Sequence, residues 1–194
     1  MQPDWLGICP HTTGMAAEAA ETDFVVLLAD MFGKNYGGMH KTNEELGKVA
    51  RSNRADIDFI LGCGKVADDA LTAEADRLGL IDISRKGAVG YCMGGGYLLE
   101  QIRNGSDFQG TVVIHVTLPI TVAPNRQNRI SGRFLAIHGS DDIVTPKPLI
   151  DALEAEMSAH GVDWQVMMFG DAPHGFCVHD ANDNIQRYDE KLCK

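Results

Sequence analysis

The sequence lacks several features that mark other classes of protein. No apolar stretch approaches the roughly 18 residues that a membrane-spanning helix needs, and we recognise no signal peptide. Basic residues are scarce, with 17 Lys and Arg against 27 Asp and Glu, and the formal net charge is −10. No long basic cluster stands out from this acidic background. This balance predicts that neither nucleic acid nor a membrane is a partner.

The sequence also lacks the paired cysteine motifs of zinc sites and thioredoxin-like centres. Its five cysteines are odd in number and none forms a Cys-x-x-Cys pair. We therefore expect free thiols, a reducing cytoplasmic setting, and neither a metal nor another cofactor. The five are Cys9, Cys63, Cys92, Cys177 and Cys193.

The 194 residues suit one domain with a sizeable core, which we expect to cover residues 1–194. Apolar runs of strand length alternate with helix-like segments, and no internal repeat is present. This order is typical of an α/β sheet with helices on both faces. Strands are expected at residues 24–29, 87–90, 111–116, 134–138 and 164–169, helices at 12–22, 42–51, 55–80, 97–103 and 148–160, and a loop at 118–128.

The most informative stretch is residues 86–96, Lys-Gly-Ala-Val-Gly-Tyr-Cys-Met-Gly-Gly-Gly. Gly90, Cys92 and Gly94 have the Gly-x-nucleophile-x-Gly spacing of a nucleophile elbow, with cysteine where serine is commoner. A strand that turns sharply into a helix needs small residues on either side of the nucleophile, because strand and helix nearly touch there. The helix N-terminus then favours a Cys92 thiolate. The alternative is a glycine-rich turn that holds an inert cysteine.

A rival motif lies upstream of this elbow. Residues 62–67 spell Gly-x-Gly-x-x-Ala, and Asp82 follows about twenty residues later, as in a dinucleotide-binding loop. Such a loop needs a hydrophobic strand directly before its first glycine. Residues 57–61 are short and interrupted by Asp58, so we expect no cofactor loop there.

Three successive predicted strands are followed by polar residues that could do chemistry. They are Cys92, then the pair Asp141 and Asp142, then His174. In an open α/β sheet functional residues collect at the carboxyl ends of the strands, and the order nucleophile, acid, base is that of α/β-hydrolases. His174 would transfer the proton, and a carboxylate would orient its ring. We favour Asp142 for the carboxylate, because Pro146 would begin the next helix; Asp141 is the alternative.

Other histidines have simpler structural interpretations. His115 and His138 lie in or at the end of predicted core strands, and we expect them to be hydrogen-bonded structural residues. His179 with Asp180 and Asp183 could suggest a metal site, but a polar tail is the simpler interpretation.

These motifs resemble those of the dienelactone hydrolase family of α/β-hydrolases, and the similarity extends over most of the chain. The family's elbow is Gly-x-Cys-x-Gly-Gly, which matches residues 90–95. Residues 29–33 are similar to a segment after an early core strand, residues 139–146 to the acid loop, and residues 173–176 to the histidine loop. The resemblance implies a three-layer, mostly parallel α/β-hydrolase sheet and a triad of Cys92, His174 and Asp142.

The resemblance also implies an oxyanion hole. Residues 4–7, Asp-Trp-Leu-Gly, are similar to the family's oxyanion segment Glu-Ile-Phe-Gly. The backbone amides of Met93 and Trp5 would then bind the oxyanion, and Asp4 would stand where the family has a glutamate that contacts the resting thiol. Dienelactone hydrolases proper have an arginine four residues after the histidine, where this chain has Val178. This difference argues against dienelactone itself as the substrate.

In that fold, one more strand lies in the sheet between the strand at residues 24–29 and the elbow strand. The chain lacks this strand and the strands that precede it in the family's sequence. It also lacks the helix expected after Lys194. Unpaired backbone groups of such a sheet must find partners. We therefore expect a shortened domain that re-pairs its strands or completes its sheet with a second copy in a homo-oligomer.

A cysteine nucleophile also restricts the substrate. A thiolate attacks carbonyls well but is itself a good leaving group, so turnover is easiest when the departing oxygen is already stabilised. We expect hydrolysis of small activated esters, such as enol-lactones, aryl esters or strained lactones. Two alternatives are a thiol-redox protein that uses Cys92 and a non-catalytic, shortened remnant of the fold.

Overall fold

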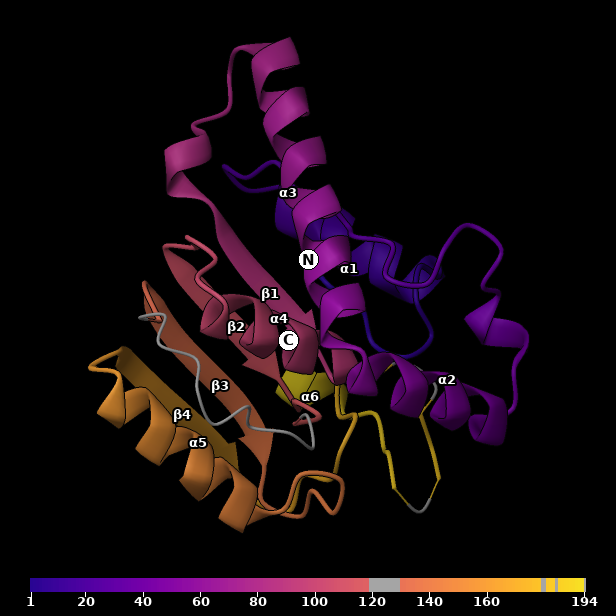
Figure 1. The fold of residues 1–194 in the computed structure, drawn as a ribbon. Coiled ribbons are helices and arrows are strands. Elements are labelled where there is room, and N and C mark those ends of the chain that lie inside the picture. Colours follow the sequence, from indigo (N-terminus) through magenta and orange to yellow (C-terminus); the bar gives the residue numbers. More distant parts are fainter. Residues whose placement is uncertain (119–129, 179–180, 184, 194) are drawn as a thin grey trace.

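The structure, a computed structural model, describes residues 1–118, 130–178, 181–183 and 185–193. Its centre is a sheet of four parallel strands in the order β1-β2-β3-β4. Because all four strands are parallel, their carboxyl ends lie along one edge of the sheet (Figure 1). The strands are β1 (Gly87–Tyr91), β2 (Gly110–Ile114), β3 (Arg133–Gly139) and β4 (Asp163–Phe169). The predicted α/β class is confirmed.

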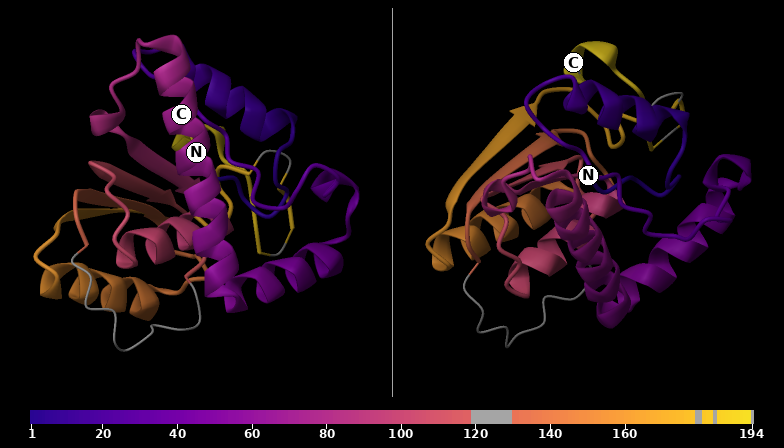
Figure 2. Two further views of the ribbon diagram at one scale, coloured as in Figure 1. Left: turned by 45° about the horizontal axis from the view of Figure 1, so that its top comes forward. Right: turned by 90° about the horizontal axis from the view of Figure 1, so that it is seen from above.

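Helices cover both faces of this sheet and make three layers. Helices α2 to α5 lie on one side, whereas α1 and the short α6 lie on the other (Figure 2). The helices are α1 (Pro10–Ala20), α2 (Asn43–Ala55), α3 (Ile57–Leu78), α4 (Met93–Arg103), α5 (Lys147–Ala159) and α6 (Glu190–Cys193), with 3-10 turns at η1 (Gly38–His40) and η2 (Ile83–Arg85).

Local sequence explains where the long helices begin. Thr42 caps α2 in a reciprocal arrangement, in which its side chain accepts from the Glu45 amide and the Glu45 carboxylate accepts from the Thr42 amide. The side chain of Asp56 accepts from the Phe59 amide and caps α3. The Gly-x-Gly-x-x-Ala motif at residues 62–67 lies inside α3, so it does not form a turn between a strand and a helix.

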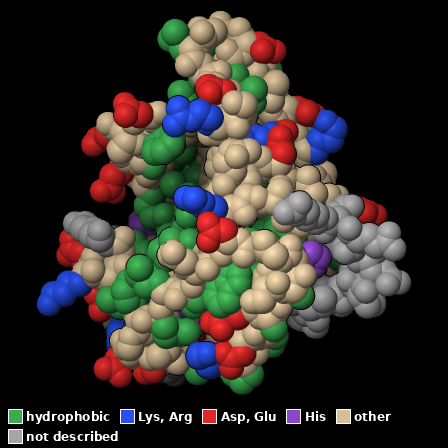
Figure 3. Space-filling view, turned by 90° about the vertical axis from the view of Figure 1, so that its left-hand side faces the viewer, with side chains coloured by type: hydrophobic (Ala, Val, Ile, Leu, Met, Phe, Trp, Pro, Cys, Tyr) green, Lys and Arg blue, Asp and Glu red, His purple; other side chains and the backbone are tan. Residues whose placement is uncertain are grey.

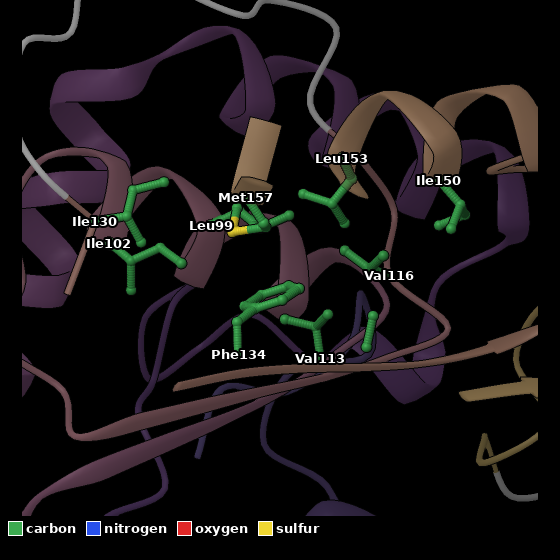
Figure 4. Close-up of a cluster of buried hydrophobic side chains, with 10 residues drawn as sticks. Leu99, Ile102, Val113, Val116, Ile130, Phe134, Ile150, Leu153 and Met157 are labelled. Atoms are coloured by element: carbon green, nitrogen blue, oxygen red, sulfur yellow. The ribbon is translucent and has the colours of Figure 1, made fainter. Parts of the chain in front are cut away.

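The main hydrophobic core lies between the sheet and helices α4 and α5. Alternate strand residues point into it, because successive side chains of a strand face opposite sides. Val113 of β2 and Phe134 of β3 pack there against Leu99 of α4 and Leu153 of α5 (Figure 4). On the opposite face, Ile114 and Ile137 pack against a cluster formed by Ala172, Phe176 and Cys177.

The prediction of a strand at residues 24–29 is wrong. The segment has no regular secondary structure, and Phe24 and Val25 are 68% and 53% exposed. A strand is defined by a ladder of backbone hydrogen bonds with a neighbour. Here the neighbour is Met1, whose terminal amine donates to Leu27 O (2.7 Å) and whose carbonyl accepts from Ala29 N (2.9 Å).

The start of the chain lies between this segment and the sheet. Gln2 forms a parallel bridge with Gly90 of β1, in which Gln2 N donates to Val89 O (2.8 Å) and Tyr91 N donates to Gln2 O (3.2 Å). Residues 24–29 therefore do not pair directly with β1. Completion of the sheet by a second copy stays a prediction.

The prediction that all five cysteines are free is also wrong. Cys177 and Cys193 form a disulfide, with their Cα atoms 5.0 Å apart, whereas Cys9, Cys63 and Cys92 are free. The bond joins α6 to the segment that follows β4. The cysteine content therefore no longer supports a cytoplasmic location, which stays a prediction.

The surface shows no separation of charges on the face drawn in Figure 3, where basic side chains are scattered among acidic ones. Ion pairs also link the two kinds of charge: Lys86 pairs with both Asp68 and Asp107. In the part of the chain that the structure describes, no helix has the length and hydropathy needed to cross a membrane. Apart from Leu118, the predicted loop at residues 118–128 lies outside the described residues.

Candidate active site

The predicted elbow forms where β1 ends and α4 begins. Cys92 stands between them with φ 52° and ψ −115°, a backbone conformation that is strained for a residue with a side chain. A methyl group on Gly90 would lie 2.7 Å from the backbone of Gly94 and Gly95, and one on Gly94 would lie 2.4 Å from Pro3 O. The close contact of strand, helix and the chain's first residues therefore explains the glycines around Cys92.

The structure brings the three predicted catalytic side chains together. The Sγ atom of Cys92 lies 3.1 Å from Nε2 of His174, and Nδ1 of His174 lies 2.7 Å from Oδ2 of Asp142. All three are buried, with 5%, 1% and 3% of their surface exposed. They follow β1, β4 and β3, whose carboxyl ends share one edge of the sheet. Parallel pairing of the strands thus makes neighbours of residues that are 82 and 32 positions apart.

The loop after β3 selects one of its two aspartates. Asp142 is fixed by its other oxygen, Oδ1, which accepts from the amides of Val144 and Thr145 (both 2.8 Å). Asp141 is exposed, and its Oδ1 accepts from the Ser140 hydroxyl (2.9 Å). Of the two carboxylates, Asp142 is the one in contact with the His174 ring.

Cys92 and Asp142 together favour the protonated form of His174. Burial alone lowers the pKa of its imidazole, but the Cys92 charge and the hydrogen bond to Asp142 outweigh burial and raise that pKa to about 10. An imidazolium 3.1 Å from Sγ stabilises a thiolate.

Thr117 is a site residue that our reading of the sequence missed. Its Oγ1 lies 3.2 Å from Cys92 Sγ and 3.4 Å from His174 Nε2, and its amide donates to Cys92 O (2.9 Å). It follows β2, whose carboxyl end lies at the same edge of the sheet. The rule that located Cys92 and His174 could therefore have located Thr117.

His115 also differs from the prediction of a hydrogen-bonded structural residue. It is fully buried, it has a positive φ of 37°, and neither ring nitrogen has a hydrogen-bond partner among the described residues. Its ring packs edge-on against His174, with centroids 5.3 Å apart, and against Phe176 at 5.1 Å. His138 fits the prediction, because its Nε2 lies 2.8 Å from Thr145 O.

The residues expected around the oxyanion lie beside the elbow. Met93 is the first residue of α4, and the half-buried Trp5 packs in the same cluster as Cys92 and Met93. Asp4 is buried, and its Oδ1 accepts from the Leu6 amide (2.8 Å). Burial raises the pKa of this carboxyl to about 6. The contact of Asp4 with the thiol stays a prediction.

The remaining residues considered from the sequence lie near the end of the chain. Val178, where the resemblance implies an arginine, is buried. Of the three residues considered for a metal site in the tail, His179 and Asp180 lie outside the described residues. Asp183 accepts from the amides of Ile185 and Gln186, as in a tight polar turn.

Comparisons with known proteins identify the family of the chain. The sequence profile of the dienelactone hydrolase family matches residues 1–193. The crystal structure of P91, a dienelactone hydrolase-like promiscuous phosphotriesterase from metagenomic libraries, is 28% identical, with a TM-score of 0.87 over 99% of this chain and 78% of that chain. The structure named m3DLH is also 28% identical, with a TM-score of 0.86 and the same coverage of both chains.

A curated relative matches a shorter region. Hydrolase pyvD of Aspergillus violaceofuscus is 29% identical over 114 residues, which are 58% of this chain and 44% of that protein. The match thus spans less than half the length of this relative. The family profile, by contrast, matches residues 1–193, a range that includes the elbow and the histidine loop. The chain belongs to the dienelactone hydrolase family.

Proposed function

We propose that this chain hydrolyses small carboxylic esters or lactones with a Cys92–His174–Asp142 triad and a thioester intermediate, and that residues 1–194 act as one domain. The observation that supports this most directly is the continuous contact from Sγ to imidazole (3.1 Å) and from imidazole to carboxylate (2.7 Å). Membership of a hydrolase family supports the same reaction class.

In the first half of the reaction, the Cys92 thiolate attacks the ester carbonyl carbon and forms a C–S bond. The carbonyl electron pair moves to oxygen, which the amides of Met93 and Trp5 would stabilise as an oxyanion. The oxyanion then collapses and the C–O bond to the leaving group breaks. His174 donates its Nε2 proton to the departing oxygen, which leaves a thioester and a neutral imidazole.

In the second half, His174 accepts a proton from water through the same Nε2 while the water oxygen attacks the thioester. Collapse of this second oxyanion expels the Cys92 thiolate and releases the carboxylic acid. Asp142 keeps Nδ1 protonated throughout, so that Nε2 faces the sulfur in the form that can exchange a proton.

The thiolate sets the range of substrates. Because sulfur is readily expelled from the tetrahedral intermediate, the leaving oxygen must be a good leaving group, as in aryl esters and enol-lactones. Phosphotriesters with aryl leaving groups form a second candidate class, because P91, which the chain resembles over 99% of its length, is described as a promiscuous phosphotriesterase.

Trapping of the acyl group tests the mechanism. The protein is mixed with p-nitrophenyl trimethylacetate, whose bulky acyl group slows hydrolysis of the thioester, then quenched in acid and digested. We expect the acyl mass on the peptide that contains Cys92, and none on peptides containing the free thiols Cys9 or Cys63. Turnover with the acyl group on another residue would show a different nucleophile.

A small set of assays separates the alternatives. Turnover of aryl esters, enol-lactones and an aryl phosphotriester identifies the hydrolase and ranks its substrate classes. Consumption of hydrogen peroxide without ester turnover would indicate the thiol-redox protein. Alkylation of Cys92 by iodoacetamide with neither activity would indicate the non-catalytic remnant.

A further inference from the structure

Three buried side chains at the elbow offer ligand atoms that lie close together. They are Cys92, His115 and His174, and one sulfur and two ring nitrogens lie within 4.8 Å of one another. Hydrolysis as described above uses Cys92 and His174 but assigns nothing to His115. The third member of the cluster therefore needs its own explanation.

His115 is unusual because its buried ring makes no hydrogen bond to the described residues. Its side chain is fully buried, and both ring nitrogens lack hydrogen bonds to the described protein groups. Leaving a buried donor or acceptor unpaired is unfavourable. The residue also adopts φ 37°, a conformation that is uncommon for a side chain of this size. Just after β2, the His115 ring therefore packs against His174 without a hydrogen bond of its own among the described residues.

Asp142 supplies a second feature of metal sites. Histidines that bind metals commonly donate their other ring nitrogen to a carboxylate, which fixes the tautomer and orients the free nitrogen. His174 does this here, because its Nδ1 lies 2.7 Å from Asp142 Oδ2 while its Nε2 faces Cys92 Sγ.

We propose that Cys92, His115 and His174 form a binding site for a thiophilic divalent cation, with Zn²⁺ as the best match, and that occupation of this site blocks hydrolysis. One thiolate and two imidazoles are a ligand set that zinc accepts, with a fourth position left for water. Ligand atoms on one tetrahedral zinc lie roughly 3.3–3.7 Å apart, given Zn–N near 2.0 Å and Zn–S near 2.3 Å. The three ligand atoms lie within 4.8 Å of one another, so the side chains must draw closer together to bind one zinc ion.

The bonds made to the metal explain the inhibition. The cation takes one electron pair from Sγ and one from each imidazole nitrogen, and the proton on Nε2 of His174 leaves for solvent. Nucleophilic attack needs the electron pair on sulfur, and proton transfer needs the one on Nε2. A bound Zn²⁺ therefore removes both functions at once, and chelation restores them.

Binding is measured directly, so that the result does not depend on the proposed hydrolysis. Chelator-treated protein is titrated with zinc chloride in competition with a chromophoric chelator, and X-ray absorption at the zinc edge identifies the ligands. We expect one Zn²⁺ per chain, with one sulfur and two imidazole nitrogens in its shell. Alkylation of Cys92 by iodoacetamide should slow over the same zinc concentrations.

His115→Asn tests the third ligand, because asparagine tolerates positive φ but removes the imidazole. Since loss of an outer-shell partner alone weakens zinc binding by about 10- to 100-fold, loss of this ligand should weaken it by at least about 100-fold. His160→Asn, at the end of α5, is the matched control and should bind as the wild type does. Inhibition by zinc is compared with each variant's own metal-free rate.

The proposal fails if the affinity of the wild type for Zn²⁺ is no higher than that of His115→Asn. It also fails if the absorption spectrum shows fewer than two imidazole ligands. The spectrum of the wild type remains decisive even if His115→Asn does not fold.

Discussion

The hydroxyl oxygen of Thr117 lies 3.2 Å from the sulfur of Cys92, and the Thr117 amide donates to the Cys92 carbonyl (2.9 Å). The residue thus holds the elbow by its backbone and contacts the nucleophile by its side chain. Because Oγ1 is also 3.4 Å from His174 Nε2, it can help to orient both members of the reactive pair.

Replacement of Thr117 by valine tests this role, since valine keeps the shape and removes the hydroxyl. A hydrogen bond to a charged group contributes roughly 1.5–3 kcal/mol, so kcat/KM for an aryl ester should fall about tenfold or more. Thr111→Val, at a buried position of β2 remote from the strand's carboxyl end, is the control and should change kcat/KM little. An equal effect of the two substitutions would assign Thr117 a purely structural role.

The two aspartates after β3 should differ sharply in their effect on rate. Asp142→Asn replaces the carboxylate 2.7 Å from His174 Nδ1 by an amide, which favours the wrong tautomer of the ring. We expect kcat to fall by at least about 100-fold, whereas Asp141→Asn should stay within about twofold of the wild type. Steady-state kinetics on one aryl ester measure both. A larger loss in Asp141→Asn would place the acid at the other residue.

Asp4 should make stability depend on pH. Burial raises the pKa of its carboxyl from 3.8 to about 6, although the Leu6 amide and the charges of His11 and His174 oppose the rise. The folded state therefore holds this proton more tightly than the unfolded state does. The contribution of the protonated Asp4 carboxyl to the free energy of unfolding is complete below pH 3.8 and is lost as the pH rises through 6. A shift of about two units corresponds to about 3 kcal/mol.

Urea unfolding of the wild type and Asp4→Asn at several pH values tests this sign. Asparagine cannot titrate, so the free energy of unfolding of Asp4→Asn relative to wild type should rise by about 2 kcal/mol between pH 4 and pH 7. A relative stability of Asp4→Asn that falls with pH would mean that its carboxylate is stabilised on folding.

The disulfide between Cys177 and Cys193 should stabilise the oxidised protein. It closes a loop with a sequence separation of 16, for which loop entropy predicts about 3 kcal/mol. Cys193→Ser should therefore unfold at lower denaturant concentration than the wild type, and dithiothreitol should remove the difference. Cys63→Ser, at a free thiol, is the control. If reductant leaves the wild type unchanged, the bond contributes nothing to stability.

Much of the site was predictable because it follows from strand order. The elbow glycines, the parallel strands and the polar residues after them place Cys92, Asp142 and His174 at one edge, and each signal is local in the sequence. Thr117 follows the same rule, but a threonine after a strand is a less conspicuous signal than a cysteine or a histidine.

The errors concern features that depend on distant parts of the chain. Residues 24–29 have the apolar run of a buried strand, but a strand also needs a neighbour, and Met1 and Gln2 offer only a short one. The Cys177–Cys193 bond depends on the path of the last residues back to the sheet, which no spacing motif encodes. The unpartnered ring nitrogens of His115 are likewise visible only once its surroundings are known.

The most direct test of the central claim is the rate of p-nitrophenyl ester hydrolysis by Cys92→Ala, with Cys63→Ala as the matched control. Loss of the nucleophile should reduce kcat/KM by at least about a thousandfold, as removal of a triad member does in other hydrolases. Cys63→Ala should retain the wild-type rate. Undiminished turnover by a folded Cys92→Ala protein would contradict the account, because the reaction would then not require the sulfur that contacts His174.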